Sequence, residues 1–218
     1  MNTHGKLIVI DGIDGSGKAT QSKILVEKIK EFGFEVETMD FPQYSKNFFG
    51  KMVRQYLDGK FGRPTEINPY LASMLYAFDR FESKEKINQW LNQGKVVILD
   101  RYYTSNFIHQ AAKLPEKKMA DFISWVEELE LKVLKIPKPD LIVYLHVEAE
   151  IAYNLIAKRG QGYDGHDTLK HLKEAEKKCL QLSKKLGWLI IECAEKNQIK
   201  EIDKIAKIIW QEIKPALD

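Results

Sequence analysis

Early in the chain the sequence reads Lys6-Leu7-Ile8-Val9-Ile10-Asp11-Gly12-Ile13-Asp14-Gly15-Ser16-Gly17-Lys18-Ala19-Thr20. Residues 7–10 are apolar, too few for a helix, and bounded by glycines, which is typical of a strand buried on both faces. The pattern Gly12-x-x-x-x-Gly17-Lys18 comes next, and apolar residues at helical spacing begin behind it. This order of strand, glycine loop, lysine and helix predicts a phosphate-binding loop.

The residue types of this loop suit an anion. Glycines let backbone N–H groups converge on a phosphate, and the following helix N-terminus adds roughly half a positive charge. Lys18 supplies a point charge for the outer phosphates. Ala19 stands where the pattern expects a hydroxyl that binds Mg²⁺, and Thr20 is one place late. The alternative is a chance glycine turn before a helix.

The composition indicates one soluble globular domain over residues 1–218, of which 44% are hydrophobic and 30% charged. The formal net charge of +3 does not demand a nucleic-acid partner, because the lysines are interleaved with glutamates. Cys179 and Cys193 have no metal-binding spacing, so we expect free thiols in a reducing cytoplasm. No apolar run approaches about 18 residues, so we expect neither a membrane span nor a signal peptide.

Short apolar segments alternate with helical patterns along the rest of the chain. Further strands are predicted at 35–41, 96–99, 141–145 and 188–191, and helices at 47–57, 68–92, 104–113, 116–134, 149–158, 168–186 and 199–213. This alternation predicts an α/β fold, a three-layer α/β/α structure around a doubly wound five-stranded parallel sheet. Ligands of such sheets bind beyond the carboxyl ends of the strands, so the loops after Ile10, Phe41 and Leu99 should surround one crevice.

Asp100-Arg101-Tyr102 follows the third predicted strand and should face the phosphate loop. Arg101 can clamp phosphate oxygens, and Asp100 can hold Mg²⁺ directly or through water. A structural ion pair is the alternative, but the phosphate loop on the same sheet edge favours the functional interpretation.

Tyr76 and Arg80 lie four residues apart on a predicted helix, so they share a face on which a nucleobase could stack and be read. From spacing alone, a core tyrosine with an exposed arginine beside it is the preferred interpretation. The polar, glycine-rich segment 160–167 suits a flexible lid, with a plain surface connection as the alternative. His166 and His171, with Asp164 and Asp167, match no common metal site, so we expect them to be solvated.

Taken together, these segments resemble the thymidylate kinase family, in the nucleoside-monophosphate kinase group of P-loop proteins. The resemblance is carried in order by residues 12–20, Phe41-Pro42-Gln43-Tyr44, Leu75-Tyr76-Ala77-Phe78-Asp79-Arg80, Asp100-Arg101-Tyr102 with Ser105-Asn106, and Lys138-Pro139-Asp140-Leu141. It implies a P-loop NTP hydrolase-like fold and transfer of the γ-phosphoryl group from ATP to dTMP, yielding dTDP with Mg²⁺. It also implies a cytoplasmic homodimer packed through helices, with small molecules rather than nucleic acid or membrane as partners.

The resemblance also implies residue roles. ATP would be held by Gly12, Ile13, Asp14, Gly15, Ser16, Gly17, Lys18, Ala19, Thr20 and Arg159. The substrate dTMP would be held by Asp14, Phe41, Tyr44, Tyr76, Arg80, Arg101, Ser105, Asn106, His109 and Gln110. Of these, Asp14 would accept the 3′-hydroxyl, Tyr76 would stack on thymine, and Arg80, Asn106 and Gln110 would approach the base. The catalytic set would be Lys18, Asp100, Arg101 and Arg159, with Asp100 near the metal.

Three departures from the family pattern stand out. Ala19 lacks the hydroxyl of many relatives, many relatives carry an aromatic residue at His109, and segment 161–167 has no lysine or arginine. Because that segment offers no cation, the positive charge would come from Arg101, Arg159 and Lys18 alone, and we expect a modest turnover. Two alternatives stay open: a kinase for another nucleoside monophosphate or for a deoxynucleoside, and a catalytically weak nucleotide-binding protein. A GTPase is disfavoured because an Asn-Lys-x-Asp motif is absent from the sequence.

Overall fold

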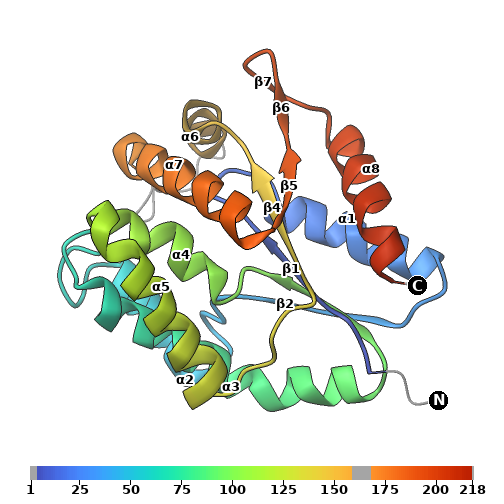
Figure 1. Ribbon diagram of the computed structural model, residues 1–218, viewed down its shortest axis with the longest axis horizontal. Helices are drawn as coiled ribbons and strands as arrows, with labels where there is room; N and C mark the ends of the chain where they lie inside the picture. The colour runs from blue at the N-terminus through green and yellow to red at the C-terminus, as the bar shows by residue number, and fades with distance from the viewer. Residues whose placement is uncertain (1–3, 159–167, 218) are drawn as a thin grey trace.

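A computed structural model describes residues 4–158 and 168–217. Its centre is a five-stranded parallel sheet in the order β2-β3-β1-β4-β5 (Figure 1). The strands are β1 (Leu7–Asp11), β2 (Val36–Asp40), β3 (Val96–Asp100), β4 (Leu141–His146) and β5 (Leu189–Glu192). The predicted α/β sheet is thereby confirmed, and every residue of β1 is buried, as its apolar run indicated.

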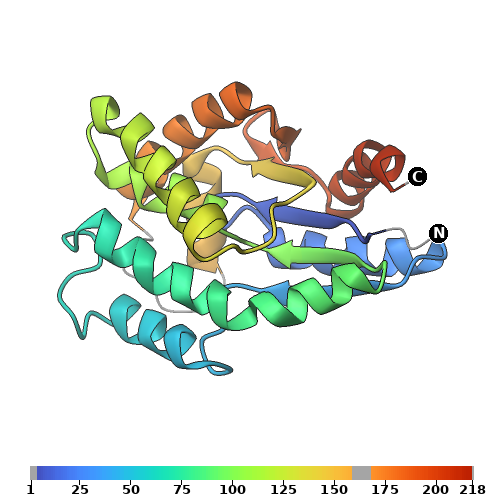
Figure 2. The ribbon, with the colours of Figure 1, turned by 60° about the horizontal axis from the view of Figure 1, so that its bottom comes forward.

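Helices cover both faces of this sheet, as Figures 1 and 2 show. They are α1 (Lys18–Glu31), α2 (Phe48–Leu57), α3 (Pro69–Asn92), α4 (Thr104–His109), α5 (Met119–Glu127), α6 (Ala149–Lys158), α7 (Leu169–Leu186) and α8 (Ile202–Ile213). Helices α1 and α8 pack against each other, while α3, α4 and α7 belong to the other layer. Helix α2 lies alongside α3 at the outside of the molecule (Figure 2).

Local side-chain chemistry explains several helix ends. The Asn47 side chain accepts a hydrogen bond from the Gly50 amide at 2.6 Å and begins α2. The Asn68 side chain likewise accepts a backbone hydrogen bond and begins α3. Pro69 lies in the first turn of α3, where its missing N–H costs nothing. Helix α7 begins at the Thr168 cap and ends at Gly187, which adopts the left-handed conformation.

Two predicted helices are interrupted in the structure. Segment 104–113 is helix α4 followed by a 3₁₀ turn, η1 (Ala111–Lys113). Segment 116–134 is a 3₁₀ turn, η2 (Glu116–Lys118), then α5, then a π-helical turn, η3 (Glu128–Val133). In η3 the Leu134 amide donates to the Leu129 carbonyl at 2.8 Å, one residue further back than in an α-helix. Apolar spacing cannot reveal such an inserted residue.

The predicted start of the last helix, at residue 199, is too early. Strands β6 (Ala194–Glu195) and β7 (Gln198–Ile199) form a small antiparallel hairpin, and α8 begins only at Ile202. Lys196 and Asn197 in the turn have φ of 52° and 60°. Two consecutive left-handed residues match the twist of a tight hairpin, but Lys-Asn is a weaker sequence signal than Asn-Gly.

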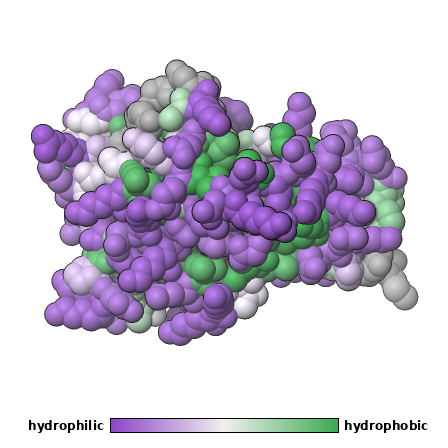
Figure 3. All heavy atoms as spheres, turned by 90° about the horizontal axis from the view of Figure 1, so that it is seen from above, coloured by the Kyte–Doolittle hydropathy of each residue, from purple (hydrophilic) through white to green (hydrophobic). Residues whose placement is uncertain are grey.

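The molecular surface is mainly hydrophilic on the face seen from above Figure 1 (Figure 3). On α7 the lysines at 170, 173, 177, 184 and 185 are exposed, while Leu172, Ala175 and Cys179 are buried. No helix in the described ranges is long and apolar enough to cross a membrane.

Candidate functional site

The phosphate-binding loop links β1 to α1 at the carboxyl edge of the sheet. Gly15 has φ of 83°, and a Cβ atom there would lie 2.5 Å from the Ala152 carbonyl oxygen, so only glycine fits. Gly17, with φ of 87°, precedes α1 and provides no side-chain cap. The first amides of α1 are therefore left without a side-chain acceptor, as an anion site requires.

Lys18 lies inside this loop. Its Nζ donates to the Ile13 carbonyl at 2.8 Å, and the residue is buried. Burial, and then the charge of Arg101, lower the pKa of Lys18 to about 8, although Asp14 and Asp100 oppose the change. Within residues 4–158 and 168–217, the ammonium donates to a backbone carbonyl and no carboxylate accepts from it, which suits it to bind an incoming phosphate.

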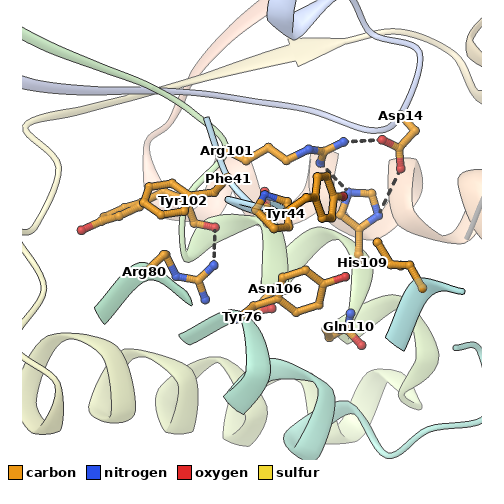
Figure 4. Close-up of a pocket in the computed structure, with 13 residues that line it drawn as sticks. Asp14, Phe41, Tyr44, Tyr76, Arg80, Arg101, Tyr102, Asn106, His109 and Gln110 are labelled. Atoms are coloured by element: carbon orange, nitrogen blue, oxygen red, sulfur yellow. Dashed lines mark hydrogen bonds and ion pairs between the residues drawn. The ribbon is translucent and has the colours of Figure 1, made fainter. Parts of the chain in front are cut away.

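A cavity with an empty volume of about 550 Å³, including open solvent, lies beside the loop (Figure 4). Its walls are Asp14, Phe41, Pro42, Tyr44, Leu57, Tyr76, Arg80, Arg101, Tyr102, Ser105, Asn106, His109 and Gln110. All the residues predicted to hold the substrate are among them. The segments that carry these residues are far apart in sequence, and the sheet edge brings them together.

One end of the cavity carries Arg101, whose guanidinium donates to the Asp14 carboxylate. Its NH1 lies 3.0 Å from His109 Nε2, and His109 Nδ1 lies 3.9 Å from the other Asp14 oxygen (Figure 4). Burial by itself lowers the pKa of Arg101, but Asp14, Asp11 and Asp100 together raise it above its usual value. Lys18 does not line the cavity, but Arg101 and Asp14 both influence its pKa, so we call Lys18, Arg101 and Asp14 together the phosphate end.

The other end carries Tyr76 and Arg80, with the Tyr76 ring edge-on to Tyr56. Arg80 is only 2% exposed, so the interpretation of Arg80 as an exposed neighbour is wrong. Its guanidinium pairs with Glu130 and its NH1 donates to the Tyr102 carbonyl at 3.4 Å. We call Tyr76, Arg80, Asn106 and Gln110 the base end.

Two amide side chains at the base end carry buried polar atoms with no partner among the described residues. These atoms are Asn106 Nδ2, a donor, and Gln110 Oε1, an acceptor. Unpaired buried polar atoms are costly, and native structures retain them mainly where a ligand or water completes the bonds. A planar ligand with both donors and acceptors on its edge would satisfy this pair.

The loop between β2 and α2 is held by Asp79, which the sequence analysis named without a role. The Asp79 carboxylate accepts from the Gln43 amide at 3.1 Å and from Asn47 Nδ2 at 2.7 Å. The loop contains a cis peptide bond between Phe41 and Pro42. Asp79 thereby fixes the wall that Phe41 and Tyr44 contribute to the cavity.

Asp11 is a residue that sequence reasoning missed. It is fully buried and accepts hydrogen bonds from Thr104 Oγ1 at 2.6 Å, Ser105 Oγ at 2.8 Å and the Gly12 amide at 2.9 Å. A carboxylate at the carboxyl end of β1, directly before Gly12, was the signal that could have found it.

Other predicted residues are placed differently. Asp100 ends β3 next to Lys18 and does not line the cavity; burial raises its pKa, whereas Lys18 and Arg101 lower it. His171 is buried, not solvated, and stacks on His109 with ring centroids 5.9 Å apart, because it faces inward from the first turn of α7. Arg159, the lid at 160–167, Asp164, His166 and Asp167 lie outside the described residues.

Several known proteins are similar to this chain. A family model described as Thymidylate kinase matches residues 10–205. Thymidylate kinase of Mycobacterium tuberculosis is 34% identical, covering 78% of this chain and 79% of its own length; the human enzyme is 31% identical, covering 88% and 84%. The solved structure of thymidylate kinase from Candida albicans aligns with a TM-score of 0.78 at 26% identity, covering 98% of this chain and 92% of that one.

Proposed function

The chain belongs to the thymidylate kinase family, and we propose that it carries out its reaction in the cavity between the phosphate end and the base end. Its activity is transfer of the γ-phosphoryl group of ATP to dTMP, which forms ADP and dTDP for dTTP synthesis. The observation that carries the site assignment is that a single cavity joins phosphate-binding and base-binding chemistry.

The base end would bind the thymine ring. Tyr76 offers a ring face for stacking, and Arg80, Asn106 and Gln110 offer donors and an acceptor for the base edge. The sugar would then lie near His109 and Asp14, between base and phosphate, with Asp14 accepting the 3′-hydroxyl. Phe41, Tyr44 and Ser105 would close the remaining walls of the cavity.

The phosphate end would bring donor and acceptor phosphates together. Amides of residues 12–20 and the Lys18 ammonium would hold the ATP phosphates, while Arg101 would bridge to the phosphate of dTMP. The acceptor is already an anion, so no general base is needed. Alignment and neutralisation of charge then supply most of the acceleration.

The residues present fit a magnesium ion held mainly by ATP. No cluster of three His, Cys, Asp or Glu residues within the described residues could hold a metal on its own. Asp100 offers one carboxylate, close to the charges of Lys18 and Arg101. Mg²⁺ usually combines one or two carboxylates with substrate phosphates and water, so Asp100 would bind it directly or through water despite Ala19. When bound, the ion neutralises phosphate charge.

An acceptor panel tests this assignment. Purified protein with ATP and Mg²⁺ should form ADP fastest with dTMP, more slowly with dUMP, and far more slowly with CMP, UMP or thymidine. Faster turnover of thymidine would favour a deoxynucleoside kinase. Binding of ATP and dTMP without ADP formation would favour a nucleotide-binding protein that has lost turnover.

We propose further that residues 1–218 act as one domain within a cytoplasmic homodimer, as the family resemblance suggests. Phe48 on α2 and Phe81 on α3 are 65% and 45% exposed, which supports a contact through these neighbouring helices. The thiols of Cys179 and Cys193 are free, in keeping with a reducing compartment. Light scattering after size exclusion should give twice the chain mass, and a monomer at micromolar concentration would refute the homodimer.

A further inference from the structure

The π-helical turn η3 contains a buried carboxylate that has no role in the proposed reaction. Glu130 is the only residue of this turn that is buried, and it is fully so. Its own carbonyl accepts from the Ile136 amide at 3.0 Å, which fixes the main chain on its carboxyl side. Burying a carboxylate is costly unless it is paired, so this position needs a specific partner.

That partner is Arg80. Its Nε lies 3.1 Å and 3.2 Å from the two Glu130 oxygens, and its NH2 also donates to the carboxylate. The carboxylate therefore engages one side of the planar guanidinium fork, while the Tyr102 carbonyl accepts from NH1. A guanidinium held along one side cannot rotate, so the direction of its remaining N–H groups is set by Glu130.

The pairing also determines what Arg80 can recognise. Because Glu130 balances its charge, Arg80 has little attraction left for a phosphate, but its remaining N–H groups can still donate. A guanidinium carries only hydrogen-bond donors. It can therefore donate to a carbonyl group of a base, but it cannot pair with an amino group at the same position. Thymine and cytosine differ there, since thymine has a carbonyl at ring position 4 and cytosine an amino group.

We propose that Glu130 is a positioning residue for base selectivity. By pairing with one side of the Arg80 guanidinium, it directs the remaining N–H donors of Arg80 toward the 4-carbonyl of the pyrimidine. This inference rests on the proposed binding of dTMP in the cavity. Glu130 does not touch the substrate and acts only through Arg80. The π-helical turn, which directly follows α5, places the Glu130 carboxylate at the base end.

The test is Glu130→Gln, which keeps the shape and removes the charge. We expect the ratio of kcat/KM for dTMP over dCMP to fall about tenfold, mainly through a higher KM for dTMP. The KM for ATP should stay within about twofold. Glu130→Asp keeps the charge but shortens the side chain, so the ratio should fall less than in Glu130→Gln, by about threefold. Glu128→Gln, an exposed position of the same turn, should behave as wild type.

A purely structural role would lower the melting temperature of Glu130→Gln and leave the selectivity ratio unchanged, which would overturn the proposal. A double-mutant cycle adds an independent check. In an Arg80→Ala background, Glu130→Gln should cause no further loss of selectivity, and an additive loss would mean that Glu130 does not act through Arg80. If Glu130→Gln does not fold, Glu130→Asp replaces it: its shorter side chain should shift the ratio about threefold, and no shift overturns the proposal.

Assays of the wild-type protein distinguish a failure of the proposed function from a failure of the role proposed for Glu130. Failure to phosphorylate dTMP would overturn the proposed function itself, whatever Glu130 does. Strong preference of the wild type for dTMP, kept unchanged in Glu130→Gln, would overturn only the role of Glu130.

Discussion

The base end and the phosphate end each contain an arginine bonded to a carboxylate, but the two pairs differ in exposure. Arg80 and Glu130 have side chains 2% and 0% exposed, whereas Arg101 and Asp14 are 19% and 30% exposed. A sealed pair keeps its geometry, while a pair that reaches solvent can exchange its partner for a ligand. At the base end, the arginine–carboxylate pair thus suits recognition of a neutral base by fixed donors. At the phosphate end, the same two residue types suit an arginine that is available to bind phosphate.

The largest expected effect lies at the phosphate end. Lys18→Ala should lower kcat by about 100- to 1,000-fold, because a buried cation directed at the transferred group is lost. The KM for dTMP should stay within about twofold, since Lys18 faces the donor. Steady-state kinetics with both substrates varied measure this, and Lys23→Ala on the exposed side of α1 is the control. A raised KM for dTMP with normal kcat would contradict the division into two ends.

At the base end the loss should appear in binding. Arg80→Ala should raise the KM for dTMP about 10- to 100-fold and weaken the preference among bases, because donors to the base disappear. It should also destabilise the protein by about 3–5 kcal/mol, since Glu130 is left unpaired. Kinetics below the melting temperature and thermal melts measure the two effects, with Glu85→Gln as an exposed control on α3. An unchanged acceptor profile would refute the role of Arg80.

The pH dependence should reveal the phosphate end. Burial, and then Arg101, lower the pKa of Lys18 to about 8, so the free protein loses this positive charge above that pH. We expect kcat/KM for ATP to decline above about pH 8, because this quantity reports groups of the free enzyme. In Lys18→Arg the decline should move to higher pH. A profile that stays level to about pH 9.5 in the wild type would mean that Lys18 keeps its proton.

The smallest effect should come from a cluster outside both ends. His146 Nδ1 lies 2.6 Å from Glu192, and Nε2 lies 3.3 Å from Glu176; the hydrogen bond to Glu176 is the main cause that raises the pKa of His146 to about 9. A raised histidine pKa stabilises the fold fully below about pH 6.5, and this contribution is lost as the pH rises through about 9. Allowing for solvent screening, the free energy of unfolding should fall by about 1–2 kcal/mol.

Denaturant unfolding at several pH values measures this loss, and His146→Gln should remove it. The base preference should not change in His146→Gln, because the cluster lies at neither end of the cavity. A change in that preference would mean that the two ends are not separate from the rest of the sheet edge.

Local patterns were sufficient to predict most of the fold. The strand at 7–10 and the glycine loop behind it depend on neighbours in sequence, and so do the caps at Asn47 and Asn68. One topological rule, that the carboxyl ends of parallel strands share an edge, predicted that the loops after Ile10, Phe41 and Leu99 surround one crevice. Resemblance to a family supplied the roles that spacing alone left open, as for Tyr76 and Arg80.

The failed predictions for Arg80 and His171 concern contacts between distant segments. Arg80 and Glu130 are 50 residues apart in the sequence, and Glu130 lies in the π-helical turn at 128–133, which apolar spacing does not reveal. His171 was expected in solvent, because nothing in its neighbourhood reveals the stacking partner on α4. Glu130 itself sits among other glutamates, so its charge pattern is that of a solvated helix.

The buried carboxylate of Asp11 has a consequence for turnover. It accepts hydrogen bonds from the Gly12 amide in the phosphate-binding loop and from Thr104 and Ser105 on α4. If ATP and dTMP bind as proposed, the spacing between their sites is therefore set by the fold before either nucleotide arrives. Folding would then have removed freedom of motion that is otherwise lost at every encounter of the two nucleotides.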